Sequence, residues 1–267
     1  RRFSYPLQEL VNDFGLNGPF RDAMQRLKKW RGEGVWDHSA QLLLREAATD
    51  YAAYYAAKPA PEAAPPEEYV VVSVDGKGVP MIQAEAAKIQ GKEGPEEGRP
   101  KKKEALVGVC HTVAPKARTA EDGAENLVYP EKAQARRAAE AGTREPDPKP
   151  REVRRLASLA PKKDVIQELV EEAEKRDPNH ARGLVLLMDG DRGLQRLTAQ
   201  AFQAWPRDQV QVILDIIHVR DYLWAAAHAL YAQGSAAAAA WVYKQLVKIL
   251  RGAVGYVIGS LKSSLAK

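Results

Sequence analysis

Three short apolar runs, each closed by an aspartate, constrain the fold of this chain more than any other feature. They cover residues 70–75 (VVVSVD), 184–189 (LVLLMD) and 210–215 (VQVILD). Short apolar runs rich in valine and leucine are typical of buried strands, which occur in sheets covered by helices. We therefore expect Asp75 and Asp189 to lie at the ends of neighbouring strands, and Asp215 to close a third strand.

The rest of the chain alternates between strand and helix patterns. A further strand is predicted over 104–113, helices over 163–176 and 194–205, and a long helical stretch from about residue 218. Glycines at 76 and 78 predict a turn, with residues 79–82 returning as a hairpin partner. Residues 114–151 are predicted to form a surface excursion with one helix near 131–141. This alternation indicates an α/β fold with some parallel pairing.

The N-terminal part has a different character. Residues 3–57 show helical patterns, and two short helices around residues 31–34 are compatible with a helix-turn-helix or with two packed helices that make no DNA contact. Residues 56–68 (AAKPAPEAAPPEE) predict a stiff proline-alanine linker. We expect a domain boundary there, after a helical region of residues 1–55.

Bulk properties exclude several classes of protein. The 267 residues contain one cysteine, Cys110, so an internal disulfide and a cysteine-built zinc site are excluded, and a reducing cytoplasmic location is expected. No apolar window reaches the length of a transmembrane helix, so no membrane partner is expected. The formal net charge of +5 favours a polyanionic partner such as nucleic acid.

The aspartates that end the strands suggest metal chemistry. Carboxylates fixed at strand ends are hard oxygen ligands of the kind that Mg²⁺ prefers, and a paired metal site can activate the attacking oxygen of a phosphodiester reaction. The alternative is that each Asp-Gly pair only marks a turn. Asp191 competes with Asp189 as a ligand but can instead cap the next helix. Asp215 and His218 can share one face of a helix beside such a site.

The order of these motifs resembles bacterial insertion-sequence transposases, in particular the Kra-type family, which is related to Mutator-like transposases. The resemblance covers roughly residues 69–260 and rests on residues 72–80, 102–108, 187–194 and 213–224. It implies an RNase H-like mixed sheet over 69–221, preceded by the small helical region and followed from residue 222 by the start of an all-helical insertion that reaches residue 267.

The resemblance also implies a function. Asp75 and Asp189 would be catalytic ligands of Mg²⁺ or Mn²⁺, with Asp215 and His218 near the active site. The partner would be double-stranded DNA, cut and joined by a DDE-type transposase that acts as a homo-oligomer near the bacterial nucleoid. The family's catalytic glutamate has no counterpart after His218. We therefore expect a chain cut inside the insertion or a degenerate relic, unable to complete strand transfer.

Basic runs are the expected contacts to DNA phosphates. Solvated surface charge is the alternative for each run. The residues predicted to bind DNA are Arg99, Lys101, Lys102, Lys103, Arg151, Arg154 and Arg155. Two further functions stay open at this point, a DNA-binding transposase remnant without catalysis and another RNase H-like nuclease.

Overall fold

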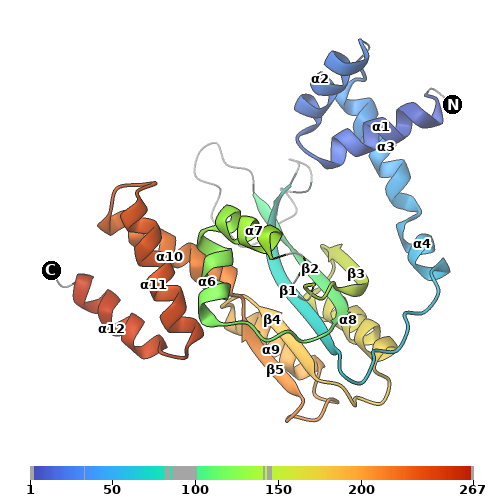
Figure 1. The fold of residues 1–267 in the computed structure, drawn as a ribbon. Coiled ribbons are helices and arrows are strands. Elements are labelled where there is room, and N and C mark those ends of the chain that lie inside the picture. The colour runs from blue at the N-terminus through green and yellow to red at the C-terminus, as the bar shows by residue number, and fades with distance from the viewer. Residues whose placement is uncertain are drawn as a thin grey trace. The chain divides into compact units, whose positions relative to one another are not determined.

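The computed structural model describes residues 3–32, 34–81, 85, 101–140, 142 and 146–265 (Figure 1). The chain divides into two compact units, residues 1–60 and 61–267. The boundary lies inside the proline-alanine segment, where the sequence predicts a linker.

The N-terminal unit is helical. It contains α1 (Tyr5–Leu16), α2 (Phe20–Arg31), α3 (Asp37–Thr49) and α4 (Tyr51–Ala57). The first three helices enclose a small core built from Val11, Met24, Leu27 and Ala40 among others. Helix α2 ends at Gly32, whose φ of 82° lies in the left-handed region that glycine adopts without steric cost.

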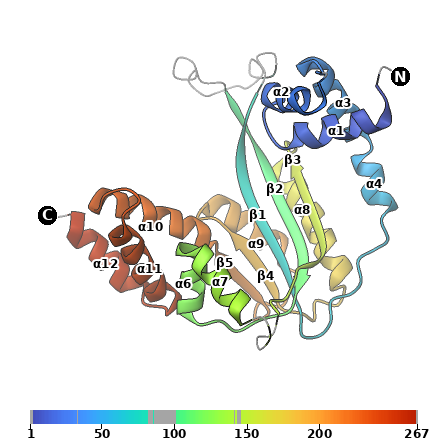
Figure 2. The same cartoon turned by 45° about the horizontal axis from the view of Figure 1, so that its top comes forward.

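A five-stranded mixed sheet forms the centre of the second unit (Figures 1 and 2). Its strands are β1 (Tyr69–Pro80), β2 (Lys102–Val113), β3 (Arg151–Ser158), β4 (Leu184–Met188) and β5 (Val210–Leu214), in the order β3-β2-β1-β4-β5. Strand β1 is antiparallel to β2 and parallel to β4; β2 is antiparallel to β3, and β4 is parallel to β5. The predicted α/β class, with some parallel pairing, is therefore confirmed as a mixed sheet flanked by helices.

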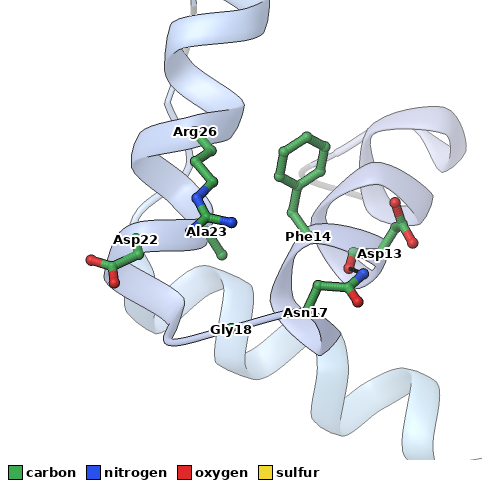
Figure 3. A pocket seen from close by; sticks show the side chains of 7 residues that line it. All are labelled: Asp13, Phe14, Asn17, Gly18, Asp22, Ala23 and Arg26. Atoms are coloured by element: carbon green, nitrogen blue, oxygen red, sulfur yellow. Dashed lines mark hydrogen bonds between the residues drawn. The ribbon is translucent and has the colours of Figure 1, made fainter. Parts of the chain in front are cut away.

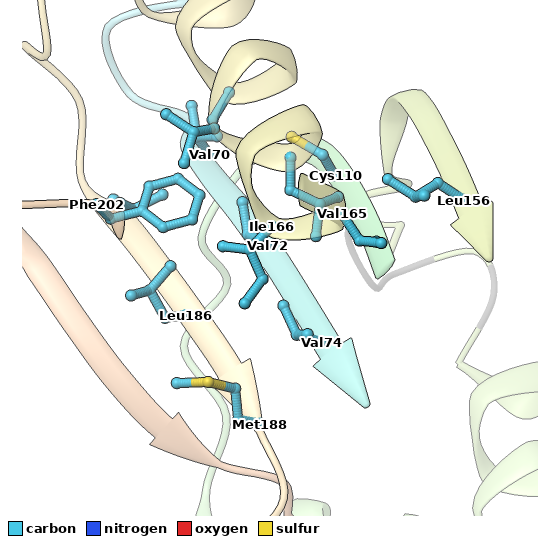
Figure 4. Close-up of a cluster of buried hydrophobic side chains, with 14 of the residues drawn as sticks. Val70, Val72, Val74, Cys110, Leu156, Val165, Ile166, Leu186, Met188 and Phe202 are labelled. Atoms are coloured by element: carbon cyan, nitrogen blue, oxygen red, sulfur yellow. The ribbon is translucent and has the colours of Figure 1, made fainter. Parts of the chain in front are cut away.

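Helices α8 (Lys162–Arg176) and α9 (Arg192–Ala201) complete the main core with the sheet. Figure 4 shows the valines of β1 beneath α8, beside Leu186 and Met188 of β4. Gly108 of β2 permits the close approach of α8, because a Cβ at this position would stand 2.6 Å from Cδ1 of the fully buried Leu169. The helix therefore sits directly on the sheet.

A second apolar cluster joins the helices that follow the sheet to part of the predicted excursion. Helices α10 (Ile216–Leu230), α11 (Ala236–Leu250) and α12 (Val254–Leu265) pack with α6 (Ala120–Val128), whose Ala124 is fully buried. Helix α7 (Pro130–Ala139) follows α6. The described part of the excursion thus holds two helices rather than the single predicted one. None of the helices in the described ranges has both the length and the apolar character to cross a membrane.

Two expectations from the sequence are wrong, and two further features were not predicted. The turn at residues 76–78 does not form, because β1 runs on to Pro80 and pairs along its whole length with β2. Strand β3 was not predicted, because the expected surface excursion ended at residue 151 and the next predicted element began at residue 163. The third apolar run is not buried, since β5 is an edge strand with exposed Val212, Ile213 and Leu214. Part of the linker is fixed, because Ala64 is buried and its N–H donates to the Arg176 carbonyl at 2.8 Å.

Candidate functional site

The register of two parallel strands places Asp75 beside Asp189. Residues of β1 and β4 pair in sequence from Val70 with Leu184 to Val74 with Met188. Asp75 and Asp189 are the next residues on their strands. Because neighbouring strands lie about 4.8 Å apart, the two aspartates occupy adjacent backbone positions. The two residues predicted as metal ligands are therefore neighbours, Asp75 within β1 and Asp189 directly after β4.

Both aspartates lie on the face of the sheet opposite α8. Side chains alternate between the two faces along a strand, and the buried Val74 and Met188 belong to the core under α8. The neighbouring Asp75 and Asp189 therefore point to the other face, where both are half-buried. Lys77 follows two residues after Asp75, so it lies on this same face, and it is exposed.

Hydrogen bonds fix the backbone around Asp189. The side-chain amide of Gln195 donates from Nε2 to the Asp189 carbonyl at 2.7 Å, and the Asp191 N–H donates to Oδ1 of Asp189 at 3.0 Å. Asp191 itself caps α9, because its Oδ1 accepts the Leu194 N–H at 2.7 Å. This bond is the main reason that the pKa of the Asp191 carboxyl is lowered. Asp191 is thus the N-cap of α9, which was one of the two roles predicted for it. Asp189 therefore stays the candidate ligand.

Asp215 occupies the matching position on β5. Met188 pairs with Leu214, and the Asp215 N–H donates to the Met188 carbonyl at 2.8 Å. Its Oδ1 accepts the Ile217 N–H at 2.8 Å, so Asp215 is the N-cap of α10. His218 lies in the first turn of that helix and is half-buried. Asp189 and Asp215 therefore follow the ends of β4 and β5, while Asp75 lies within β1 at the register position next to Asp189.

The side chains fit a divalent cation only in part. Paired carboxylates at a sheet edge supply hard oxygen donors, and Mg²⁺ usually completes its shell with waters. Across the residues that the structure describes, however, no three histidine, cysteine or acidic side chains are grouped closely enough to hold a metal ion. The site offers two neighbouring carboxylate positions, and Asp215 is engaged at the start of α10.

The predicted DNA-binding residues do not form one patch. Lys101 precedes β2, Lys102 and Lys103 begin it, and the three arginines lie on β3. Lys103 is six residues along β2 from Val109, the partner of Arg155, which corresponds to about 20 Å. Arg151 forms an ion pair with Glu68 at 3.2 Å. Arg99 falls outside the described residues.

Strand alternation sorts these basic residues by face. Paired residues on neighbouring strands have their side chains on the same face. Asp75 pairs with Val107, and Val79, which is on the face of Asp75, pairs with Lys103. Lys103 and Arg155 therefore share the face of Asp75, whereas Lys102 lies on the α8 face. Lys77 lies on this face as well. It was not predicted as a site residue because a turn was expected at residues 76–78. Since β1 continues through these residues, the alternation of side chains along the strand places Lys77 on the face of Asp75.

Cys110 is not part of a reactive centre. It is fully buried under α8, and this burial raises the pKa of its thiol to about 12. The pKa of the adjacent His111 is lowered, first by burial and then by the charges of Arg176 and Arg155. The two side chains point to opposite faces of β2, as their adjacency predicts. A cysteine nucleophile is unreactive in this state.

No family model, no curated protein and no solved structure matches the chain.

Proposed function

We propose that this chain is the core of a DDE-type DNA transposase, and that Asp75 and Asp189 together bind Mg²⁺ or Mn²⁺. The observation that carries the proposal is the register of β1 and β4, which leaves these two carboxylates at adjacent positions. They were singled out from separate apolar runs 114 residues apart in the chain. Such a pair is costly unless a cation or a proton offsets the repulsion between the two charges.

The architecture supports the proposal. The resemblance to insertion-sequence transposases implies an RNase H-like sheet, and a mixed sheet of five strands in the order β3-β2-β1-β4-β5 is compatible with it. Ligands of open α/β sheets bind outside the carboxyl ends of parallel strands, where the order of the strands reverses. The last paired residues of β1 and β4, Val74 and Met188, lie at such a point, because the chain continues from β1 to β2 on one side and returns to β4 on the other.

Each nearby residue has a role in this proposal. When bound, a divalent cation would polarise a phosphodiester and lower the pKa of an attacking water or hydroxyl. Asp75 and Asp189 would hold it, while Gln195 fixes the backbone of Asp189. Lys77 and Lys103, on the same face as the carboxylates, would neutralise the phosphates that flank the reacting bond.

A second candidate function is DNA binding without catalysis. The resemblance implies a third carboxylate, a glutamate, yet no glutamate follows His218. Among the described residues, no three histidine, cysteine or acidic side chains are grouped closely enough to hold a metal ion. Two carboxylates support metal binding more readily than a complete cutting and joining reaction. We therefore expect this chain to bind metal and DNA without efficient strand transfer.

A plasmid-binding experiment tests the proposal. Supercoiled plasmid is incubated with the full chain in Mn²⁺ or in EDTA, and DNA retention, nicking and joined products are measured. We expect retention to be stronger in Mn²⁺, and the Asp75→Asn variant to lose only this increment. The control is Asp208→Asn, which removes an exposed acid that is not part of the proposed metal site.

The outcomes separate the candidate functions. A metal increment that is unchanged in Asp75→Asn would refute the metal site. Rapid cutting and joining that depends on Asp75 would show that two carboxylates suffice, which would overturn the expected incompleteness. Nicking that depends on Asp75 and yields no joined products would instead favour an RNase H-like nuclease.

A further inference from the structure

Positive charge in the N-terminal unit is concentrated on helix α2. This helix carries five basic residues and one acidic residue, Asp22. Its neighbours are acidic on balance: α1 has two acids and no basic residue, and α3 has two acids and one arginine. The basic residues of α2 are Arg21, Arg26, Lys28, Lys29 and Arg31. Because the charge is segregated on one element, it forms a local field that favours anions.

The basic side chains are held away from the core. Ala23, Met24 and Leu27 bury one side of α2. Arg21 and Lys28 are seven residues apart, so they lie along one line of the helix, and both are exposed. The exposed Lys29 follows Lys28, close to the centre of the solvent side. The helix thus presents a line of cations next to a well-packed support.

An exposed tryptophan adjoins this line. Trp36, directly before α3, shares an open hollow with Arg21 and Lys28 and is 85% exposed. Tryptophan is enriched at interfaces because it combines a broad apolar surface with one hydrogen-bond donor. The ion pair of Arg21 with Asp37 spans 3.9 Å and is exposed, so it contributes little and can be exchanged for another anion.

The opposite side of α2 is less suited to anions. Figure 3 shows the hollow between α1 and α2, where Arg26 lies with Asp13 and Asp22. The two carboxylates that line this hollow would repel a phosphate. The hollow measures about 150 Å³, which is below the range of typical small-molecule sites. The side with Arg21, Lys28 and Trp36 is therefore the better surface for a polyanion.

We propose that this face of α2 binds the phosphate backbone of double-stranded DNA. Arg21, Lys28 and Lys29 would contact phosphates, and Trp36 would pack against the backbone at the edge of the contact. A helix of twelve residues is about 18 Å long, and the major groove of duplex DNA is wide enough to admit it. In a helix-turn-helix the second helix reads the groove. Here α2 is the first helix of the α2–α3 pair, and we assign the DNA contact to it because it carries the basic residues.

The test measures DNA affinity of the full chain in EDTA, so that the metal site proposed above plays no part. Binding of a labelled 20-base-pair duplex and of one of its single strands is followed by fluorescence anisotropy at several salt concentrations. We expect the triple variant Arg21→Gln, Lys28→Gln, Lys29→Gln to bind the duplex at least about tenfold more weakly. Its slope of log affinity against log salt should fall by about 2 to 3.

Three controls make the result decisive. A matched triple variant in the second unit, Arg196→Gln, Arg207→Gln, Lys244→Gln, should stay within about twofold of the wild type, since it loses the same charge elsewhere. The charge-preserving triple Arg21→Lys, Lys28→Arg, Lys29→Arg should retain binding, which excludes misfolding as the cause. Trp36→Ala should weaken binding without changing the salt slope.

Specific results would overturn the proposal. Equal losses in the two glutamine triples would show that only net charge matters, and no loss in the α2 triple would exclude the helix. Tighter binding of the single strand than of the duplex would exclude the groove contact. The α2 triple is scored in EDTA, whereas the proposed function is scored by the difference in binding between Mn²⁺ and EDTA, so the inference and the proposed function can fail independently.

Discussion

Asp75 and Asp189 follow directly on Val74 and Met188, the last paired residues of two adjacent parallel strands. The two acids therefore stand at neighbouring backbone positions although the chain between them contains a hairpin, an excursion and a helix. Asp189 is further fixed by Gln195. A rigid sheet sets the spacing of the pair, so changes at either residue should affect one shared site.

The face of the sheet that carries the acids can be tested with two neighbouring lysines. Lys103 lies on the face of Asp75, and Lys102 lies on the α8 face. We predict that Lys103→Gln weakens duplex binding in Mn²⁺ several-fold, because it removes a phosphate contact, while Lys102→Gln changes it less than twofold. Filter binding at fixed salt measures both. A larger effect of Lys102→Gln would place the DNA on the other face.

Gln195 is predicted to act as a positioning residue. Its amide holds the Asp189 carbonyl at 2.7 Å, so Gln195→Leu should free the strand end and weaken Mn²⁺ binding by about tenfold. Gln200→Leu, an exposed change on the same helix, is the control and should leave the affinity unchanged. Thermal unfolding should show similar midpoints for both variants. Equal Mn²⁺ affinities in the two variants would exclude this role.

Burial of Cys110 predicts a loss of stability in alkali. The pKa of the thiol is raised from 9.0 to about 12, so the folded state keeps a proton that the unfolded chain releases above pH 9. The contribution of this thiol to the free energy of unfolding is therefore constant below pH 9. It falls by about 1.4 kcal/mol per pH unit as the pH rises from 9 towards 12. Urea unfolding between pH 8 and pH 10.5 should show this extra slope in the wild type. Cys110→Ala should lack it, and parallel slopes would show that the thiol ionises as readily in the folded state.

The sequence predicted the parts of the fold that depend on local pattern. Strands β1, β2, β4 and β5 and helices α8 and α9 follow apolar runs or one-sided apolar periodicity, and these were found near the expected residues. Strand β3 was missed because half of its residues are charged and no apolar run marks it. Its strand conformation depends on pairing with β2, which no local pattern reveals.

The errors near the site have a similar origin. Gly76 and Gly78 suggested a turn, but pairing with β2 extends β1 to Pro80, and the Glu104 side chain lies against Gly76 where another residue would carry its Cβ. The position of Lys77 on the face of Asp75 followed only after this correction. The matching motifs around Asp75 and Asp189 suggested that the two residues are neighbours. The register that places them at adjacent positions is known only from the pairing of β1 with β4.

The most direct test of the account is calorimetric titration of Mn²⁺ into the wild type, Asp75→Asn, Asp189→Asn and the control Asp208→Asn. If Asp75 and Asp189 bind one cation together, each of the first two variants should lose at least about tenfold in affinity, because hard oxygen ligands dominate such a site. The Asp208 variant should match the wild type. Unchanged Mn²⁺ affinity in both Asp75→Asn and Asp189→Asn would contradict the shared site.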